Sequence, residues 1–386
     1  MTKVDGLAVT IAEKNTLRRL RLAFVGMRGL PADLPKAGGG ERETEAKATR
    51  LAQLGHDVTV YCRWHYHRHP QSPYKGIRLI SLPSIPTKNL DTVTHSFLAT
   101  LHAGLKDTAD IISFHGMGNA LYVPLARMLR KKTVVYMDGV DWERPKWGGL
   151  ARRILHLSAR MAFRWSDAVY VDNTASRRAF ESIFGSSAEV ITLAPEIWED
   201  PGSDQLAKFG LEPGKYILFV GLLKPDKGVH LLVEAYNRLA TSMPLVIVGD
   251  SPDKGEYLQN LMQSGDERVK FLGYVYGREA QQLFANCHIY VQPSLMEGNS
   301  PALMSAMACN RCVVVSDIEQ NLETIGEAGL SFRSGDPDSL WAVLSTLLDD
   351  PVQVGSLGQK ARERINSYYN WDVVVDQLDG LYQKIA

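Results

Sequence analysis

The stretch LMEGNSPALMSAMA, residues 295–308, holds residue types well suited to binding an anion. Ser300 and Pro301 have the composition of a helix start, because serine is a favoured N-cap and proline loses no hydrogen bond in the first turn. A helix start presents unpaired N–H groups and the positive end of the helix dipole, and both attract anions. The Glu297 carboxylate lies just ahead of it. The stretch therefore predicts either an anion site beside an acid or simple helix capping.

Two other loops carry groups that suit a phosphate. VGLLKPDKG, residues 220–228, offers Lys224 and Lys227 close to a predicted helix start, and a lysine acts as a point charge toward phosphate. The loop VGMRGLPADLPKAGGGERE contains Gly39 and Gly40, whose bare backbone can approach a phosphate closely. This loop lacks the G-x-G-x-x-G fingerprint of dinucleotide-binding proteins. Solvated lysines and a loop without a ligand remain the alternatives.

The composition fits a soluble globular protein of two or three domains, with 386 residues of which 45% are apolar. The apolar runs are shorter than the roughly 20 residues of a membrane-spanning helix, and the N-terminal residues do not resemble a secretory signal. Four cysteines predict no disulfide framework in a chain of this length. Cys309 and Cys312 form one C-x2-C pair without a second, so we expect a buried turn and strand there and not a metal site.

The formal net charge is zero, yet the two halves of the chain differ in charge. Residues 1–200 contain 28 Lys+Arg and 20 Asp+Glu, whereas residues 201–386 contain 15 and 23. The positive excess of the first half indicates that it faces an anionic partner, such as a membrane surface or phosphates. Ordinary variation between two domains is the alternative.

Short apolar runs alternate with helical patterns through both halves, and these elements must position the loops. The predicted strands are at residues 20–26, 57–62, 77–82, 110–116, 132–139 and 167–173 in the first half, and at 215–221, 245–250, 269–274, 288–294 and 311–317 in the second. Segments 43–55 and 227–240 show helical spacing. Strands separated by helices predict parallel βαβ units. Two consecutive sets predict an α/β protein of two Rossmann-like doubly wound domains, with a boundary near residues 193–204 and a ligand cleft at the carboxyl ends of the strands.

Taken in order, these motifs resemble glycosyltransferase family 4, whose members are retaining nucleotide-sugar transferases of the GT-B fold. The family's G-R-L-x-x-x-K-G loop corresponds to GLLKPDKG, and its E-x7-E stretch corresponds to EGNSPALMS. The first half resembles most the rhamnosyltransferase-like subgroup of bacterial surface-polysaccharide assembly, through AGGGERETEAKATRLAQLGHDVTVYCR, HGMGNALYVPLARML and MDGVDWERPKWGGLARRILHLSARMA. The resemblance implies an N-terminal extension at 1–20, an acceptor domain at 21–197, a donor domain at 198–366 and a C-terminal helix at 367–386 that crosses back to the first domain.

The resemblance also implies a donor site in which Glu297 faces the sugar. The N–H groups of Asn299, Ser300 and Ala302 would then meet the diphosphate, together with the Lys227 ammonium. The other residues that it implies at this site are Gly39, Gly40, Gly221, Lys224, Tyr274, Val275, Gly298, Pro301 and Ser305. Such groups stabilise the charge that grows on a leaving diphosphate, so we expect no metal and no other cofactor.

Two residues depart from the family's pattern. The arginine expected after Gly221 is Leu222, and the second glutamate of the E-x7-E stretch is Ser305. In the family that glutamate binds the ribose hydroxyls, so serine suits a deoxyribose donor such as dTDP-rhamnose. A weakened transferase or a catalytically silent binding subunit is the other interpretation.

The first half contributes candidate residues at two predicted strand ends, His115 in SFHGMGN and Asp138 in YMDGVDWER. With the glutamate named above, these are our candidate catalytic residues. Asp138 or Asp141 would position or deprotonate the acceptor hydroxyl, and Asp141, Trp142 and Arg144 are the candidate acceptor-binding residues. A strand-end histidine without a catalytic role and a turn with a packed tryptophan are the alternatives.

A basic segment, residues 148–166, combines helical spacing with apolar residues and four arginines, Arg152, Arg153, Arg160 and Arg164. It predicts either an interfacial helix on anionic lipid or an amphipathic helix that covers the core of the first domain with solvated arginines.

These patterns together predict a retaining glycosyltransferase, a hexosyltransferase, that moves a sugar such as rhamnose to a saccharide or lipid-linked acceptor in polysaccharide synthesis. A transferase of the same fold that uses a UDP- or GDP-sugar, and a silent nucleotide-sugar-binding subunit, are the alternatives. We expect a cytoplasmic protein, peripheral on the inner face of the cell membrane and without a nucleic-acid partner.

Overall fold

The computed structural model describes residues 18–32, 39–66, 72–87, 90–106, 109–143, 147–251 and 255–386. The chain divides into two compact units. Unit 1 comprises the residues up to Tyr170, Phe180–Glu189 and Val375–Ala386, and unit 2 comprises Val171–Ala179 and Val190–Val374. The predicted extension at residues 1–20 lies outside the described residues, apart from its last three.

Unit 1 is built on a seven-stranded sheet with the order β3-β2-β1-β4-β5-β6-β7. The strands are β1 Arg21–Val25, β2 Asp57–Arg63, β3 Arg78–Leu82, β4 Ile111–His115, β5 Lys132–Met137, β6 Ala168–Val171 and β7 Glu189–Val190. Strand β1 pairs in parallel with both β2 and β4. This pairing is expected where helical crossovers connect successive strands.

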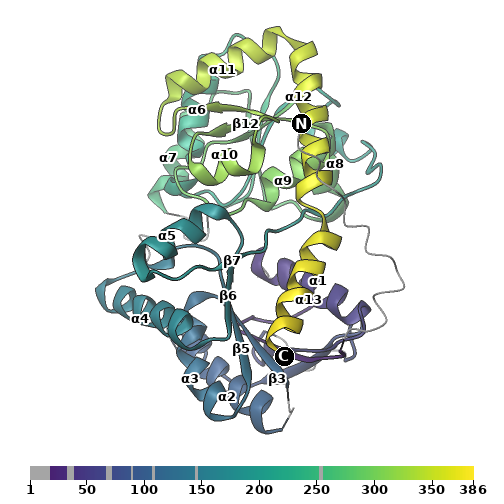
Figure 1. Cartoon of the computed structure of the whole chain (residues 1–386). Helices are drawn as coiled ribbons and strands as arrows, with labels where there is room; N and C mark the ends of the chain where they lie inside the picture. The colour runs from purple at the N-terminus through teal and green to yellow at the C-terminus, as the bar shows by residue number, and fades with distance from the viewer. Residues whose placement is uncertain are drawn as a thin grey trace, which may run out of the picture. The chain divides into compact units, whose positions relative to one another are not determined.

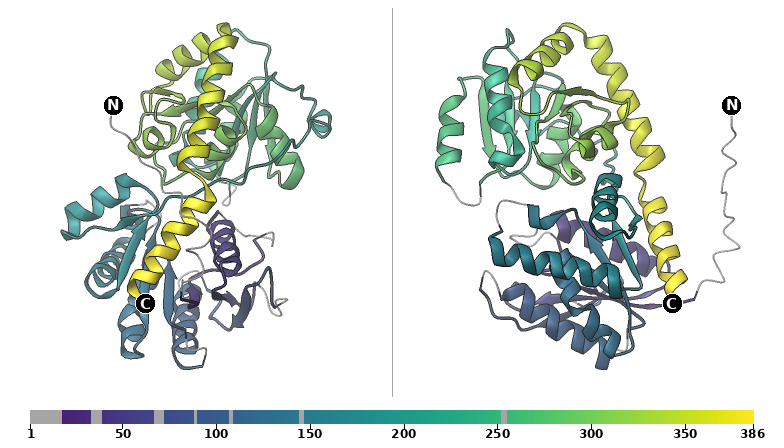
Figure 2. Two further views of the ribbon diagram at one scale, coloured as in Figure 1. Left: turned by 45° about the vertical axis from the view of Figure 1, so that its right-hand side comes forward. Right: turned by 60° about the vertical axis from the view of Figure 1, so that its left-hand side comes forward.

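Helices cover both faces of this sheet. They are α1 Gly39–Gln53, α2 Asp91–Leu105, α3 Val123–Met128 and α4 Gly149–Trp165, together with the 3-10 helices η2 Met117–Tyr122 and η3 Asp141–Glu143. Helices α5 Thr174–Phe184 and α13 Trp371–Ile385 are divided between the two units, and their residues from Phe180 and from Val375 onward belong to unit 1. Figures 1 and 2 show α2, α3 and α4 side by side on one face of the sheet, with α1 and the end of α13 on the other.

The end of the C-terminal helix α13 belongs to unit 1 and is held there by buried hydrogen bonds. The His56 ring accepts the Leu20 N–H at Nδ1, so its Nε2 donates to the Asp379 carboxylate, at 3.0 Å. The Tyr382 hydroxyl donates to Ser113 Oγ on β4, at 3.2 Å. These bonds fix the last turns of the chain against the sheet.

Unit 2 repeats the same architecture with a six-stranded sheet in the order β10-β9-β8-β11-β12-β13. Its strands are β8 Ile217–Val220, β9 Leu245–Val248, β10 Val269–Gly273, β11 Ile289–Gln292, β12 Cys312–Ser316 and β13 Leu330–Phe332. Its helices are α6 Val229–Asn237, α7 Glu256–Ser264, α8 Gly277–Asn286, α9 Pro301–Ala308, α10 Glu319–Ile325, α11 Pro337–Asp349 and α12 Pro351–Tyr368, with η4 Leu206–Phe209 and η5 Pro225–Lys227.

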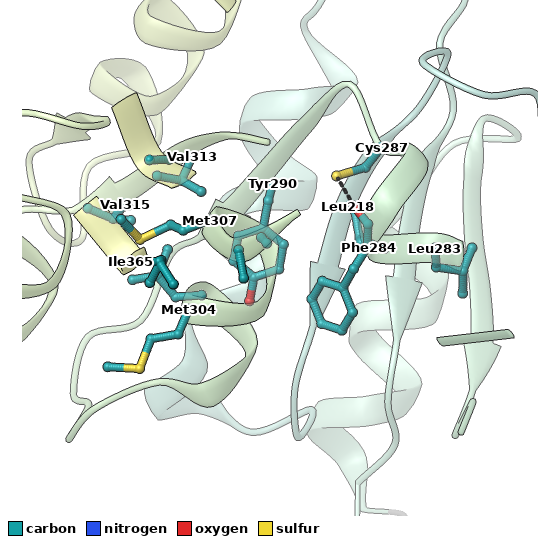
Figure 3. Close-up of a cluster of buried hydrophobic side chains, with 14 of the residues drawn as sticks. Leu218, Leu283, Phe284, Cys287, Tyr290, Met304, Met307, Val313, Val315 and Ile365 are labelled. Atoms are coloured by element: carbon teal, nitrogen blue, oxygen red, sulfur yellow. Dashed lines mark hydrogen bonds between the residues drawn. The ribbon is translucent and has the colours of Figure 1, made fainter. Parts of the chain in front are cut away.

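A buried apolar cluster supports the part of unit 2 where β11 leads into α9. Tyr290 of β11 and Met304 and Met307 of α9 belong to it and are fully buried. Figure 3 shows these side chains with others of the cluster. Because side chains in a close-packed interior have little freedom, this cluster holds the end of β11 and the start of α9 in a defined position.

The two sheets confirm the predicted fold class of two doubly wound α/β domains. Each of the eleven predicted segments overlaps a strand of the structure. The prediction missed β7 and β13, which have two and three residues and therefore leave no recognisable apolar run. Residues 171–179 and 190–197, which the resemblance assigned to the first domain, group with unit 2.

Candidate active site

The loop after β8 carries Lys227 and packs closely on the segment after β11. It ends at Gly228, which has a φ of +63°. A Cβ atom at Gly228 would overlap the carbonyl oxygen of Pro293, so only glycine allows this approach. The Leu295 N–H donates to the carbonyl oxygen of Asp226, at 2.9 Å. The two loops therefore form one packed structure.

Lys227 and Glu297 meet at this junction, although 70 residues separate them in the sequence. The Lys227 ammonium forms an ion pair with Glu297 Oε2, and the two side chains are 20% and 11% exposed. Burying a charge costs free energy unless an opposite charge or hydrogen bonds compensate. In this structure the predicted phosphate-binding lysine and the predicted sugar-facing acid compensate each other.

Two polar residues that the sequence analysis missed hold the other oxygen of Glu297. Gln292 Nε2 donates to Glu297 Oε1 at 2.8 Å, and Ser294 Oγ lies 3.4 Å from the same atom. Both residues come at the carboxyl end of β11, where the apolar run IYV gives way to QPS. Polar residues at the carboxyl end of a buried strand are the signal that could have identified them. Their bonds fix Oε1, while Oε2 faces Lys227.

Tyr290 determines how the Gln292 amide is oriented. Burial raises the pKa of Tyr290 well above its ordinary value, and the Glu297 charge raises this pKa further. The phenol therefore stays protonated at neutral pH and donates to Gln292 Oε1, at 2.6 Å. Because Oε1 accepts this bond, the amide nitrogen is the atom that donates to Glu297.

Helix α9 begins at the predicted place. Ser300 is its N-cap and accepts the Leu303 N–H at 3.3 Å, with Pro301 in the first helical position. The first N–H groups of a helix have no partner within it, so this end of α9 keeps the anion-attracting character that the sequence predicts. The Asn299 side chain donates to the Asp172 carbonyl oxygen at 2.5 Å and fixes the preceding segment. Around it, Gly298, Asn299, Ala302 and Ser305 are half-buried.

The other donor-site candidates of unit 2 also follow strand ends. Gly221 comes directly after β8, and Lys224 lies half-buried in the same loop. Leu222 is 39% exposed, so an apolar surface occupies the place of the family's arginine. Tyr274 and Val275 follow β10, and the Tyr274 ring stacks on the next tyrosine of that loop with 6.0 Å between ring centroids.

His115 lies at the end of β4, as predicted, but is buried, with 4% of its surface exposed. Burial lowers the pKa of His115 to about 3, and the Lys47 charge contributes in the same direction. The ring packs against Phe24 and Tyr136, with centroid distances of 4.9 and 5.7 Å. The imidazole is therefore uncharged at neutral pH, and its catalytic role stays a prediction.

The structure brings Asp138 to the same sheet edge as His115, because it follows β5, the neighbour of β4. Asp141 and Trp142 lie in η3. The half-buried Trp142 ring packs against His156 of α4, with 5.0 Å between centroids. A contact of Trp142 with an acceptor would use the exposed part of the ring.

For three remaining site candidates the described part of the structure shows no contact that bears on ligand binding. Arg144 lies outside the described residues. Gly39 and Gly40 are exposed in the first turn of α1, where a Cβ atom would meet nothing within 4 Å. Close backbone approach to a ligand stays a prediction for both glycines.

Two family models match successive parts of this chain. Residues 38–196 match the model described as "Glycosyl transferase 4-like domain", and residues 214–350 match "Glycosyl transferases group 1". The chain belongs to the family 4 glycosyltransferases. In this transferase the 4-like domain precedes the group 1 domain along the chain.

Two relatives of the transferase are enzymes of bacterial glycan synthesis by name. The O-antigen chain mannosyltransferase B of Escherichia coli is 32% identical over 152 residues, which are 38% of this chain and 40% of the relative. The N-acetylgalactosamine-N,N'-diacetylbacillosaminyl-diphospho-undecaprenol 4-alpha-N-acetylgalactosaminyltransferase of Campylobacter jejuni is 29% identical over 204 residues, 52% of this chain and 55% of the relative. The chain thus spans about half the length of these relatives.

The fold of the transferase is similar to that of a solved nucleotide-sugar complex. The HepE protein of Anabaena in complex with UDP-glucose superposes with a TM-score of 0.78 at 18% sequence identity, over 95% of this chain and 100% of that chain. This similarity supports the GT-B fold.

The described part of the transferase contains neither a metal-binding cluster nor a membrane-spanning helix. No group of three or more His, Cys, Asp or Glu residues is arranged there to hold a metal ion. Every described helix is too short or too polar to span a lipid bilayer.

Proposed function

We propose that the transferase moves a hexose from a nucleotide diphosphate sugar to a saccharide or lipid-linked acceptor, with retention of the anomeric configuration. The observation that carries this proposal is the Lys227–Glu297 ion pair beside the start of α9, all within unit 2. A cation and a helix start suit a diphosphate, whereas a fixed carboxylate suits sugar hydroxyls.

The two oxygens of Glu297 have different roles in this proposal. Oε1 stays bonded to Gln292 and keeps the carboxylate in position. A bound diphosphate competes for the Lys227 ammonium and releases Oε2, which then accepts a hydroxyl of the donor sugar. When the bond between the anomeric carbon and the diphosphate breaks, Lys227 and the start of α9 stabilise the negative charge on the leaving group.

The acceptor oxygen forms its bond to the anomeric carbon on the face that the diphosphate leaves, which gives retention. Its proton passes to the leaving diphosphate or to a base, for which Asp138 is the candidate in unit 1. The rate of sugar transfer then depends on how well the acceptor hydroxyl and the group that takes its proton are positioned relative to the sugar.

For the donor we favour a deoxyribonucleotide sugar such as dTDP-rhamnose. A carboxylate can accept hydrogen bonds from two vicinal ribose hydroxyls, whereas Ser305 offers a single hydroxyl group. The Anabaena complex contains UDP-glucose and the Escherichia coli relative is named a mannosyltransferase. A UDP- or GDP-sugar is therefore the competing donor.

For the acceptor we favour a lipid-linked saccharide reached from a peripheral position on the membrane. The name of the Campylobacter jejuni relative specifies a diphospho-undecaprenol acceptor. Helix α4 exposes four arginines, Arg152, Arg153, Arg160 and Arg164, which suit anionic lipid.

Thermal unfolding with dTDP, UDP, GDP and their sugars tests the proposal, because a ligand that binds only the folded state raises the midpoint. We expect dTDP to raise the midpoint at least as much as UDP. Ser305→Glu should shift the preference toward UDP by a few-fold to about a hundredfold, since one hydrogen bond contributes about 0.5–1.5 kcal/mol, or up to about 3 with a charged partner. A midpoint that none of these compounds raises would refute the proposal, and NMR of the product's anomeric proton tests retention.

A further inference from the structure

Unit 1 has an apolar groove of about 490 Å³ that the proposed reaction leaves unassigned. The segment after β3 contributes Pro83 and Ile85, helix α2 contributes Val93, Phe97 and Leu98, and η2 contributes Tyr122. We call the surface formed by these six residues together with Ser84 and Thr94 the α2 groove. Its volume lies within the range of small-molecule sites.

The polar groups of the α2 groove are already bonded within the protein. Among the described lining residues, Ser84 Oγ donates to Asp91 Oδ1 at 2.7 Å and the Tyr122 hydroxyl donates to the Val93 carbonyl oxygen at 2.6 Å. Thr94 Oγ1 donates to the Leu90 carbonyl oxygen at 2.8 Å. The groove therefore presents an apolar surface to whatever enters it.

Large apolar side chains of the α2 groove nevertheless face solvent. Ile85 is 48% exposed, Val93 42% and Phe97 44%. Single exposed apolar residues are common on protein surfaces, but a concave group of them marks a binding surface.

The α2 groove lies at the sheet edge that carries the acceptor candidates of unit 1. Helix η2 begins two residues after His115, the last residue of β4, and ends at Tyr122 in the groove. Six residues of 3-10 helix span about 12 Å, at ~2.0 Å per residue. A ligand with its reactive end near His115 and its tail in the groove would therefore need a head group between them.

The helices near the α2 groove carry more basic than acidic residues, which attracts anions to this part of unit 1 over a distance. Helix α2 lies on one side of η2, where Ser96 Oγ bonds the Asn119 side chain, and α4 lies on the other, where Ser158 Oγ bonds the Met117 carbonyl oxygen. The described helices α2, η2, α3 and α4 contain five arginines and one acid, Asp91, whose carboxylate is paired with an arginine of β2.

We propose that the α2 groove holds the aliphatic chain of a lipid with a phosphate head group, the lipid part of the acceptor; this inference rests on the proposed function. A hydrocarbon chain needs apolar surface and no hydrogen bonds, as the groove provides. A peptide strand would bring backbone carbonyl groups that need donors, and the hydroxyls of the groove already donate their protons within the protein. The arginines of α4 lie on the exposed face of that helix and not on the face that packs against η2, so they favour an anionic head group only through their field and not by direct contact.

Calorimetric titration of the full chain with dodecyl phosphate, below its micelle concentration, tests the proposal. Phe97→Ser and Val93→Ser should each weaken binding by about tenfold, because each removes much of the apolar surface that the chain covers. Leu105→Ser is the matched control, since Leu105 lies on the same helix, is 64% exposed and is outside the groove. This control should bind dodecyl phosphate like the wild type.

Two further probes separate the chain from the head group. Inorganic phosphate should bind far more weakly than dodecyl phosphate, and dodecyl maltoside should bind in the groove more weakly than dodecyl phosphate. Equal affinity of the groove variants and Leu105→Ser would overturn the proposal. A concentration-dependent dimer that Phe97→Ser dissociates would also overturn it, because a second copy of the chain would then occupy the groove.

The titration does not depend on sugar transfer, so its failure can be told from failure of the proposed function. Each variant should keep the wild-type melting midpoint and the wild-type affinity for the nucleoside diphosphate that unit 2 binds. Loss of dodecyl phosphate binding with intact nucleotide binding locates the effect in the groove. If the wild type binds the nucleotide but no dodecyl phosphate, the proposal for the groove is refuted and the proposed function is not.

Discussion

In unit 2, a bound ligand can take the place of each partner in the Lys227–Glu297 ion pair. An ion pair with both partners largely buried is expensive to break without compensation. A diphosphate supplies that compensation for Lys227, and a sugar hydroxyl supplies part of it for Glu297. We therefore interpret the pair as the arrangement of the site before the donor binds.

Lys227→Ala should weaken binding of the donor diphosphate by about 1–3 kcal/mol, the contribution of a hydrogen bond to a charged group. Calorimetry with the nucleoside diphosphate measures this loss. The matched control is Lys215→Ala, because Lys215 pairs with Glu212 on the surface of the same unit. If both variants bind the nucleotide like the wild type, the loop after β8 is not part of the donor site.

Glu297→Gln should lower turnover of the sugar donor strongly while leaving binding of the free nucleoside diphosphate nearly unchanged. The amide keeps the size of the carboxylate but loses its charge and one acceptor oxygen. Steady-state kinetics and calorimetry on the same preparation separate the two effects. An equal loss for donor and free nucleotide would instead indicate that Glu297 only holds the loops together.

Helix α4 is an element whose two faces have different environments. Its inner face is buried through small or apolar residues, Leu155, Ser158, Ala159 and Ala162. Its outer face exposes Leu150, Ile154 and Leu157 together with the four arginines. Solvated arginines alone would not explain the apolar residues on this face, so the composition favours contact with anionic lipid.

Vesicles that contain anionic phospholipid should sediment the protein at low salt and release it at high salt, because ions screen the attraction. Replacing the four arginines, Arg152, Arg153, Arg160 and Arg164, with glutamine should abolish sedimentation. Replacing the four lysines and arginines Lys208, Lys215, Arg238 and Arg278 of unit 2 with glutamine is the control for total charge. Wild-type protein that stays in the supernatant at every salt concentration would contradict membrane association.

The whole molecule should lose stability in mild acid through two buried histidines. Burial lowers the pKa of His115 to about 3 and that of His95 to about 4. An unfolded chain binds protons at these positions near pH 6.5, while the folded chain does not. The stability that the neutral rings provide is therefore fully present above pH 6.5 and is lost as the pH falls toward the folded pKa values.

Between pH 6.5 and 5.0 each of the two histidines should lower the free energy of unfolding by about 1.6 kcal/mol. This is less than the full slope of 1.36 kcal/mol per pH unit would give, because the unfolded ring is already about half protonated at pH 6.5. His115→Phe keeps an aromatic ring between Phe24 and Tyr136 and removes the titration. Its melting midpoint should therefore fall less between pH 7 and pH 5 than that of the wild type, as measured by calorimetry. Parallel curves for the two proteins would show that His115 is not buried uncharged.

Much of the architecture could be predicted from the sequence because the relevant patterns are local. Apolar runs separated by helical segments predict parallel βαβ units. Because ligands bind at the carboxyl ends of such strands, the polar residues there are the candidates for the site. Ser300 and Pro301 indicate the start of α9 by composition alone. The spacing of arginines and apolar residues in segment 148–166 likewise predicts the amphipathic helix α4, because a helical period is visible within one stretch of chain.

The tertiary structure alone decided which of these residues meet and which are buried. Contact between Lys227 and Glu297, and the bonds of Gln292 and Ser294 to the same carboxylate, depend on neighbouring strand ends that are distant in sequence. Burial of His115 depends on the rings that surround it, which no local pattern reveals. The α2 groove likewise arises from three separate segments, because a concave surface is a property of packing and not of any single stretch of sequence.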